Sequence, residues 1–302
     1  MKYFQHIADY CQAINIRPPM HPHFDIRNFK DNMASVVQKM PAFQHEFYAI
    51  AIRKKGAGIA TTGNFESEHH QEIFFNSPFQ IISWDIMPDW EGYYLMFSSD
   101  FVAQSKLLQN LIIDFPFLTI DKTMPFGVNH QELQFFHTLF EQIASEYYGN
   151  QEDAFQFIEA QVYLMLLQIK RCYRKLGLDA HVAAEIRNSN VRLFSRFRSM
   201  IEVSFSEQRS HPSMNPHSTK SYAAQLHIHP NYLNATVKKV TGKTALQHIH
   251  EHIIYKAKSY LLQTSLSVKE IAYQLHFESP NRFNAFFKKH VNQTPLAYRE
   301  QA

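Results

Sequence analysis

The sequence predicts an α+β protein of two domains, with short strands in the first domain and only helices in the second. The chain has 302 residues, more than a single hydrophobic core usually serves. Residues 22–127 contain short β-branched and aromatic runs, whereas apolar side chains later recur every three or four positions. Residues 1–189 hold 15 Lys and Arg against 21 Asp and Glu, and residues 190–302 hold 15 against 6. The net charges of −6 and +9 therefore indicate that the second domain has a polyanionic partner.

Residues 1–128 are predicted to form a domain built mainly of strands. Helical spacing of apolar residues predicts a first helix over residues 1–16. Four later runs predict strands, and they are residues 47–52, 72–75, 80–84 and 92–97. Turn residues separate these runs, as in Gly56-Ala-Gly58 and Thr62-Gly63-Asn64. Several short strands at this spacing are typical of a sandwich or a small β-barrel.

Residues 129–176 are predicted to form a helical hairpin that breaks at Gly149 and Asn150. Its apolar seams consist of Leu133, Phe136, Phe140, Ile143 and Tyr147 in one helix and Phe155, Ile158, Val162, Met165, Ile169 and Cys172 in the other. Such seams suit a dimer interface and packing against the chain's own first domain equally well. Residues 177–189 are interpreted as a linker.

The second domain, residues 190–302, contains one pattern twice. Residues 221–244 and 270–294 each predict a short helix, a turn and a second helix with a Lys-Lys pair, about fifty positions apart. A helix over 190–207 precedes the first copy, a loop over 206–219 follows that helix, and residues 244–263 predict a connecting helix of ~30 Å. A duplicated helix-turn-helix in a basic domain is typical of proteins that bind duplex DNA.

Residues that favour helix N-termini predict where these helices begin. Ser267 and Glu270 fit a capping box, and Ser279 with Pro280 suits an N-cap and the first helical position. Pro230 suits the first helical position in the first repeat. The second helices would then present polar side chains to base edges near their N-termini. We predict base contacts by Asn231, Tyr232, Asn234, Asn281, Arg282 and Asn284, and phosphate contacts by Lys238, Lys239, Lys288 and Lys289. The connecting helix can space two recognition helices about one DNA turn, ~34 Å, apart.

Residues 190–302 resemble the AraC-type DNA-binding domain over its whole length. The matching residues are 267–272 (Ser-Val-Lys-Glu-Ile-Ala), Phe277, Phe283, 286–289 (Phe-Phe-Lys-Lys) and 294–299 (Thr-Pro-Leu-Ala-Tyr-Arg). The resemblance implies seven helices and assigns base contact to Asn231, Asn234, Asn281 and Arg282. Two departures are His276 and Asn292 at places where the family has glycine, and both residue types tolerate positive φ. Ala235 and Ala285 stand where many members have arginine, so two family contacts are missing.

Residues 76–78 and 91–101 resemble the cupin-type sensor and dimerisation half of AraC-like regulators. The resemblance implies a cupin-like β-barrel that holds a small-molecule effector, a homodimer formed through the hairpin, and RNA polymerase as a further partner. The effector-binding residues are not assigned, although Phe47, Phe74, Phe75, Trp84 and Phe97 are candidates for a pocket or for the core. The predicted function is a sequence-specific DNA-binding transcription regulator, not an enzyme. Two alternatives are a regulator without an effector and a metal-dependent cupin enzyme fused to a DNA-binding module.

A metal centre is not expected in the barrel. Enzymatic cupins use a His-x-His pair, whereas the corresponding stretch has only His45, and His69 and His70 are adjacent. His21 and His23 alternate but lie between prolines. No catalytic residue or cofactor is predicted, and the only two cysteines, in positions 11 and 172, are too few for a disulfide framework. The sequence has no apolar run of membrane length and no signal-peptide pattern, which predicts a cytoplasmic protein without a membrane partner.

Overall fold

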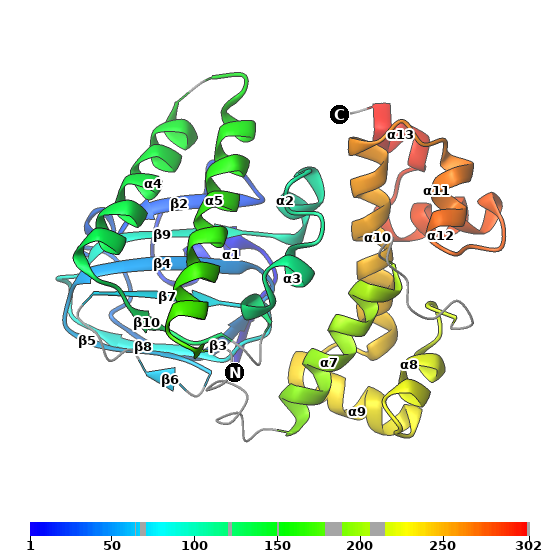
Figure 1. Ribbon diagram of the computed structural model, residues 1–302, viewed down its shortest axis with the longest axis horizontal. Coiled ribbons are helices and arrows are strands. Elements are labelled where there is room, and N and C mark those ends of the chain that lie inside the picture. Colours follow the sequence, from blue (N-terminus) through cyan, green and yellow to red (C-terminus); the bar gives the residue numbers. More distant parts are fainter. Residues whose placement is uncertain are drawn as a thin grey trace. The chain divides into compact units, whose positions relative to one another are not determined.

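The computed structural model describes residues 1–63, 65–66, 71–119, 123–149, 151–178, 189–205 and 215–300. Two compact units make up the chain, Met1–Phe101 with Phe115–Arg187 and Val102–Asp114 with Asn188–Ala302. The first unit holds two sheets and the second is helical, so the predicted α+β class is confirmed (Figure 1). In the described residues, no helix is both long and apolar enough to cross a membrane.

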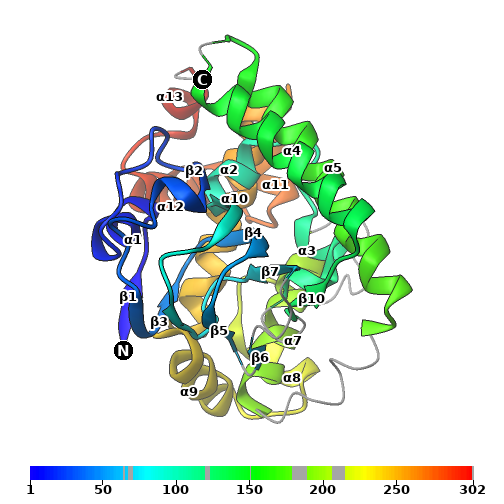
Figure 2. The ribbon, with the colours of Figure 1, turned by 90° about the vertical axis from the view of Figure 1, so that its left-hand side faces the viewer.

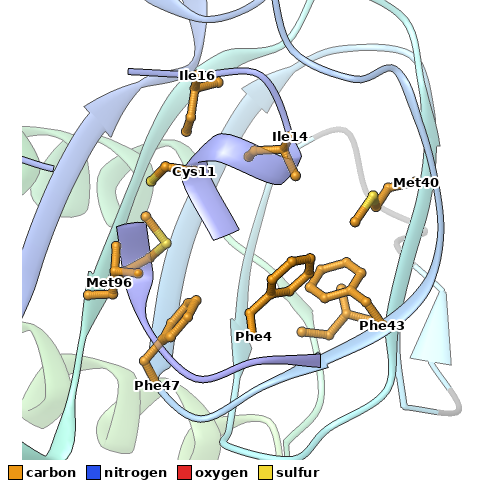
Figure 3. Close-up of a cluster of buried hydrophobic side chains, with 10 residues drawn as sticks. Phe4, Cys11, Ile14, Ile16, Met40, Phe43, Phe47 and Met96 are labelled. Carbon is orange, nitrogen blue, oxygen red and sulfur yellow. The ribbon is translucent and has the colours of Figure 1, made fainter. Parts of the chain in front are cut away.

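Two five-stranded sheets form the centre of the first unit. One contains, in order, β1 (Lys2–Phe4), β3 (Lys39–His45), β8 (Ile82–Ile86), β5 (Gly58–Thr62) and β6 (Phe65–Glu66). The other contains β10 (Phe126–Gly127), β7 (Glu72–Asn76), β4 (Tyr48–Lys55), β9 (Glu91–Phe97) and β2 (Phe24–Asn28). Side chains of both sheets meet in one core, where Phe43 of β3 and Met96 of β9 join Cys11 of α1 (Ile7–Ala13) (Figure 3). The barrel-like domain therefore encloses an aromatic and aliphatic interior.

The predicted helix over residues 1–16 is wrong at its start. Residues Lys2–Phe4 form β1, which pairs in parallel with β3, and only Ile7–Ala13 is helical. Phe4, Ile7 and Cys11 are all buried, so the apolar spacing identified the inward face. The extended backbone of Lys2–Phe4 depends instead on pairing with the open edge of β3. The spacing of apolar residues does not reveal such a pairing. The four predicted strands are present, but β2, β3, β5, β6 and β10 were not predicted.

The helical hairpin consists of α4 (His130–Tyr148) and α5 (Ala154–Lys175). It covers one sheet, because α4 packs against α5 and against β2, β4 and β9 (Figure 2). Its seam residues are buried inside the chain except Phe155, which is partly exposed, and Phe136, Phe140, Val162 and Met165 are fully buried. The seams therefore give no support to a dimer, and packing against the first unit accounts for them.

The described residues of the range 189–300 form seven helices, as predicted. They are α7 (Ser189–Ser204), α8 (Thr219–Gln225), α9 (Pro230–Thr241), α10 (Ala245–Gln263), α11 (Val268–Gln274), α12 (Pro280–Val291) and α13 (Pro295–Glu300). The connecting helix α10 is central, because it packs against the other six. Its buried side chains Ile249, Ile253, Ala257 and Leu261 form the predicted apolar face. Most of the predicted loop over 206–219 and of the predicted linker over 177–189 lies outside the described residues.

The second unit also contains a segment that the sequence assigns to the first domain. The short helices α2 (Ser99–Gln104) and α3 (Leu111–Asp114) lie on either side of Gln109. The Gln109 carbonyl accepts hydrogen bonds from Tyr255 Oη and Lys256 Nζ of α10, each at 3.2 Å. The side chain of Gln263 bonds to the Gln109 side chain and to the Ala103 carbonyl. Residues 102–114 are therefore part of the helical unit.

Candidate nucleic-acid interface

Two equivalent helix-turn-helix motifs stand about fifty positions apart, α8 with α9 and α11 with α12. The turns share one backbone conformation, because His227 and His276 both have positive φ, at 55° and 60°. The second helices also end alike, at Gly242 with φ 78° and at Asn292 with φ 61°. His276 and Asn292 thus adopt the left-handed conformation expected where the family has glycine. The sequence repeat is a structural repeat.

Local hydrogen bonds determine where each second helix begins. Nδ1 of His229 accepts from the backbone N–H of Asn231 at 3.2 Å, and Oγ of Ser279 accepts from that of Arg282 at 3.4 Å. A proline stands at the first helical position after each of these N-caps. The predicted capping box of α11 is present, with Ser267 and Glu270 bonded reciprocally. Since the caps fix the first turns, they also fix which side chains those turns present.

The predicted contact residues occupy the exposed faces of α9 and α12. Asn231, Tyr232, Asn281, Arg282 and Asn284 are exposed, and the Arg282 side chain is 68% accessible. The opposite faces are buried through Leu233, Thr236, Val237, Phe283 and Phe287. The lysines predicted for phosphate contact are exposed further along the same helices, and they are Lys238, Lys239, Lys288 and Lys289. Each helix therefore has polar side chains first and cationic ones later along its free face.

Asn234 is the exception among the predicted base-contact residues. It is only partly exposed, and its Oδ1 accepts a hydrogen bond of 3.1 Å from the backbone N–H of Ala245. Asn284 has the same place in the second repeat but is exposed. The residue equivalent to Ala245 there is Pro295, which has no N–H to donate. The bond thus tethers α9 to the start of α10 through Oδ1 of Asn234, which sets this residue apart from the other predicted base-contact residues.

Among the predicted contact residues, Arg282 forms an ion pair with a neighbouring side chain on the surface. Arg282 Nη1 lies 2.6 Å from Glu278 Oε2, and both side chains are well exposed. Such a surface pair contributes little to stability, on the order of 0–1 kcal/mol. Arg282 can therefore exchange Glu278 for an external acceptor at small cost.

Two histidines of α10 lie in the core of the second unit. Burial, together with the nearby positive charges of Arg198 and Lys243, lowers the pKa of His248 to about 3. Its Nε2 forms a hydrogen bond of 2.8 Å with Thr241 Oγ1 at the end of α9. Burial also lowers the pKa of His252 well below its usual value. Both rings are therefore neutral at pH 7.

The first unit contains a cavity of about 90 Å³. Phe47, Phe74 and Trp84, proposed from the sequence, line it, whereas Phe75 and Phe97 do not. Burial lowers the pKa of the lining residue His45 to about 3, so its ring is neutral. Among the described residues no group of three metal-ligand side chains occurs, and His69 and His70 lie outside them. His21 and His23 contact each other edge to face, and Nδ1 of His21 accepts from the backbone N–H of His23.

Comparisons with known proteins give matches to the helical unit alone and matches to most of the chain. Residues 222–301 match the family model described as a helix-turn-helix domain. The uncharacterized HTH-type transcriptional regulator YtdP of Bacillus subtilis is 37% identical over 79 residues, which cover 26% of this chain and only 10% of YtdP. The HTH-type transcriptional activator RhaS of Shigella dysenteriae is 22% identical over 273 residues, covering 86% of this chain and 87% of RhaS. The solved C-terminal domain of AraT, a response regulator from Geobacillus stearothermophilus, is 25% identical over 38% of this chain and 89% of that one, with a TM-score of 0.34.

Proposed function

We propose that this chain, whose residues 222–301 form an AraC-type helix-turn-helix domain, is a transcription regulator that recognises specific DNA sequences through α9 and α12. The observation that supports this most is the duplication of an exposed recognition face. Helix α10 between the two motifs has 19 residues, a length of about 28 Å at 1.5 Å per residue. That length is close to one DNA turn of ~34 Å, so a single chain can place two helices in successive major grooves.

The side chains on these faces have complementary roles. An asparagine amide can both accept from and donate to adenine, and an arginine can donate twice to guanine. Asn231, Asn281 and Asn284 would read adenines and Arg282 a guanine, with Tyr232 beside them. The exposed lysines further along each helix would bind phosphates, which orients the protein without reading sequence.

Selection from a random duplex library tests this function with the full-length protein. We expect enrichment of one motif with two elements about ten base pairs apart, because the recognition helices enter successive grooves. The affinity for that motif should fall linearly on a logarithmic salt scale, with a slope near −0.9 per neutralised phosphate. Absence of any enriched motif, together with a flat salt response, would refute the proposal.

We further propose that a small uncharged effector in the first unit controls DNA binding. The cavity of about 90 Å³ is lined mostly by aromatic and aliphatic side chains, and its histidine is neutral. A dry cavity of about 150 Å³ is large enough to hold benzene. The effector would therefore be small, or its binding would displace side chains. The small volume also supports a second candidate, a regulator whose barrel binds no effector. A homodimer and RNA polymerase remain proposed partners of either form.

Ala51 offers a direct test of the effector site, since it is buried and lines the cavity. We expect small uncharged aromatic compounds to raise the Tm of the full-length protein and to change its affinity for the selected duplex. Ala51→Val, which fills part of the cavity, should lose both responses while the protein still folds and binds DNA. Equal responses in the variant and the wild type would contradict this location of the effector.

A further inference from the structure

We infer that the recognition faces select A·T base pairs, with α9 reading A·T pairs alone, and that the Ala235 and Ala285 methyl groups contact the 5-methyl groups of thymines. The inference rests on the proposed DNA-binding function and specifies which DNA is bound. It goes beyond asparagine contacts, because it assigns a role to two alanines at the centre of the exposed faces.

The exposed side chains of α9 have no partner for a G·C pair. Guanine is read best by arginine or lysine, and cytosine by a carboxylate. No acidic residue and no arginine occurs in α9, and its lysines begin only at Lys238, two turns after the N-terminus. The exposed residues of its first two turns are Asn231, Tyr232 and Ala235. Asparagine matches adenine, and alanine matches the methyl group of thymine.

The positions of the alanines make such a methyl contact geometrically direct. Ala235 lies four residues after Asn231 and three before Lys238, so the three share one face of the helix. Ala285 has the same relation to Asn281 and Lys288. Both alanines are exposed. A short side chain between the base-reading turn and the phosphate-binding turn lets the backbone approach the groove floor, where thymine methyl groups project.

The two helices differ in how much they depend on this contact. Helix α12 has three exposed polar readers in Asn281, Arg282 and Asn284. Helix α9 has fewer, because Asn234 is bonded to the start of α10. The half-site bound by α9 should therefore be A·T only, and methyl contacts should carry a larger share of its specificity. The half-site bound by α12 should include one G·C pair, read by Arg282.

Replacing thymine with uracil tests the inference, since uracil pairs with adenine but lacks the methyl group. The full-length protein is first used to select its duplex, and each thymine is then replaced singly. Loss of one buried methyl contact should weaken binding about four-fold, which corresponds to ~0.8 kcal/mol. We expect this loss at a thymine within the α9 half-site and no change at thymines between the half-sites.

Variants assign the effect to the alanine. Ala235→Gly should bind thymine and uracil duplexes equally, whereas Ala224→Gly, an exposed alanine of α8, should keep the wild-type preference. Equal wild-type affinity for both duplexes, or a G·C-rich half-site for α9, would overturn the inference while DNA recognition stands. Failure to select any motif would overturn the proposed function as well. The wild-type comparison decides the matter even if Ala235→Gly folds poorly.

Discussion

The pair Asn234 and Asn284 provides a sharp test of how the two repeats differ. Their equivalent positions would predict equal roles, but only Asn234 accepts a hydrogen bond from the next helix, at 3.1 Å from the Ala245 N–H. Ala245 is fully buried, so water cannot readily replace the lost acceptor in Asn234→Ala. Asn284 is exposed. Pro295, which stands in the place of Ala245, has no N–H to donate, so Asn284→Ala removes no equivalent hydrogen bond.

The two substitutions should therefore affect different quantities. An unsatisfied buried N–H costs about 1–3 kcal/mol, and the higher helix propensity of alanine returns up to ~0.7 kcal/mol. Asn234→Ala should thus lower the free energy of unfolding of the helical unit by about 1–2 kcal/mol, or its Tm by at least ~4 °C. Asn284→Ala should leave stability unchanged or slightly raised and should lose ~1–3 kcal/mol of discrimination at one base pair.

Two spectroscopic signals separate the units in the full-length protein. The only two tryptophans, Trp84 and Trp90, belong to the first unit, so their fluorescence should melt alike in the wild type and both variants. Circular dichroism at 222 nm should show an earlier helical transition in Asn234→Ala alone. Competition binding with single-base variants of the selected duplex measures discrimination. The reasoning is refuted if Asn234→Ala melts like the wild type and alters base preference as Asn284→Ala does.

Three further substitutions and one change of pH give distinct outcomes. In competition assays, Arg282→Ala should relax preference at one base pair, whereas Lys289→Ala should weaken all duplexes equally; identical base profiles would contradict these roles. Phe140→Lys should destabilise the first unit by at least ~3 kcal/mol in urea titrations, because Phe140 is fully buried beside Tyr93; a stable soluble variant would contradict this. Burial lowers the folded-state pKa of His248 and His252. Their contribution to the free energy of unfolding is therefore fully present above pH ~6.5, and it is lost as the pH falls toward the folded-state pKa. From pH 6.5 to 5 the titration of His248 should cost the second unit on the order of 1–2 kcal/mol, and that of His252 should add to the loss; urea titrations that agree at both pH values would refute this.

The sequence determined the helix-turn-helix units because their signals are local. The capping box at Ser267, the N1 prolines and the left-handed Asn292 involve residues within four positions of each other, and such interactions can be recognised along the chain. The buried faces were predictable for the same reason, since the spacing of apolar residues depends on one helix alone. That is why the exposed positions of Asn231, Asn281 and Arg282 agree with the prediction.

Only the tertiary structure decided which surfaces meet. An apolar or polar pattern shows that a group needs a partner, but not which distant residue supplies it. The seam around Phe140 found its partners within the first unit, and Lys2–Phe4 became a strand because the edge of β3 was open. Asn234 accepts a hydrogen bond from the Ala245 N–H, eleven residues later, and the Gln109 carbonyl accepts one from helix α10, far along the chain. These partners depend on three-dimensional proximity, which a periodic pattern does not encode.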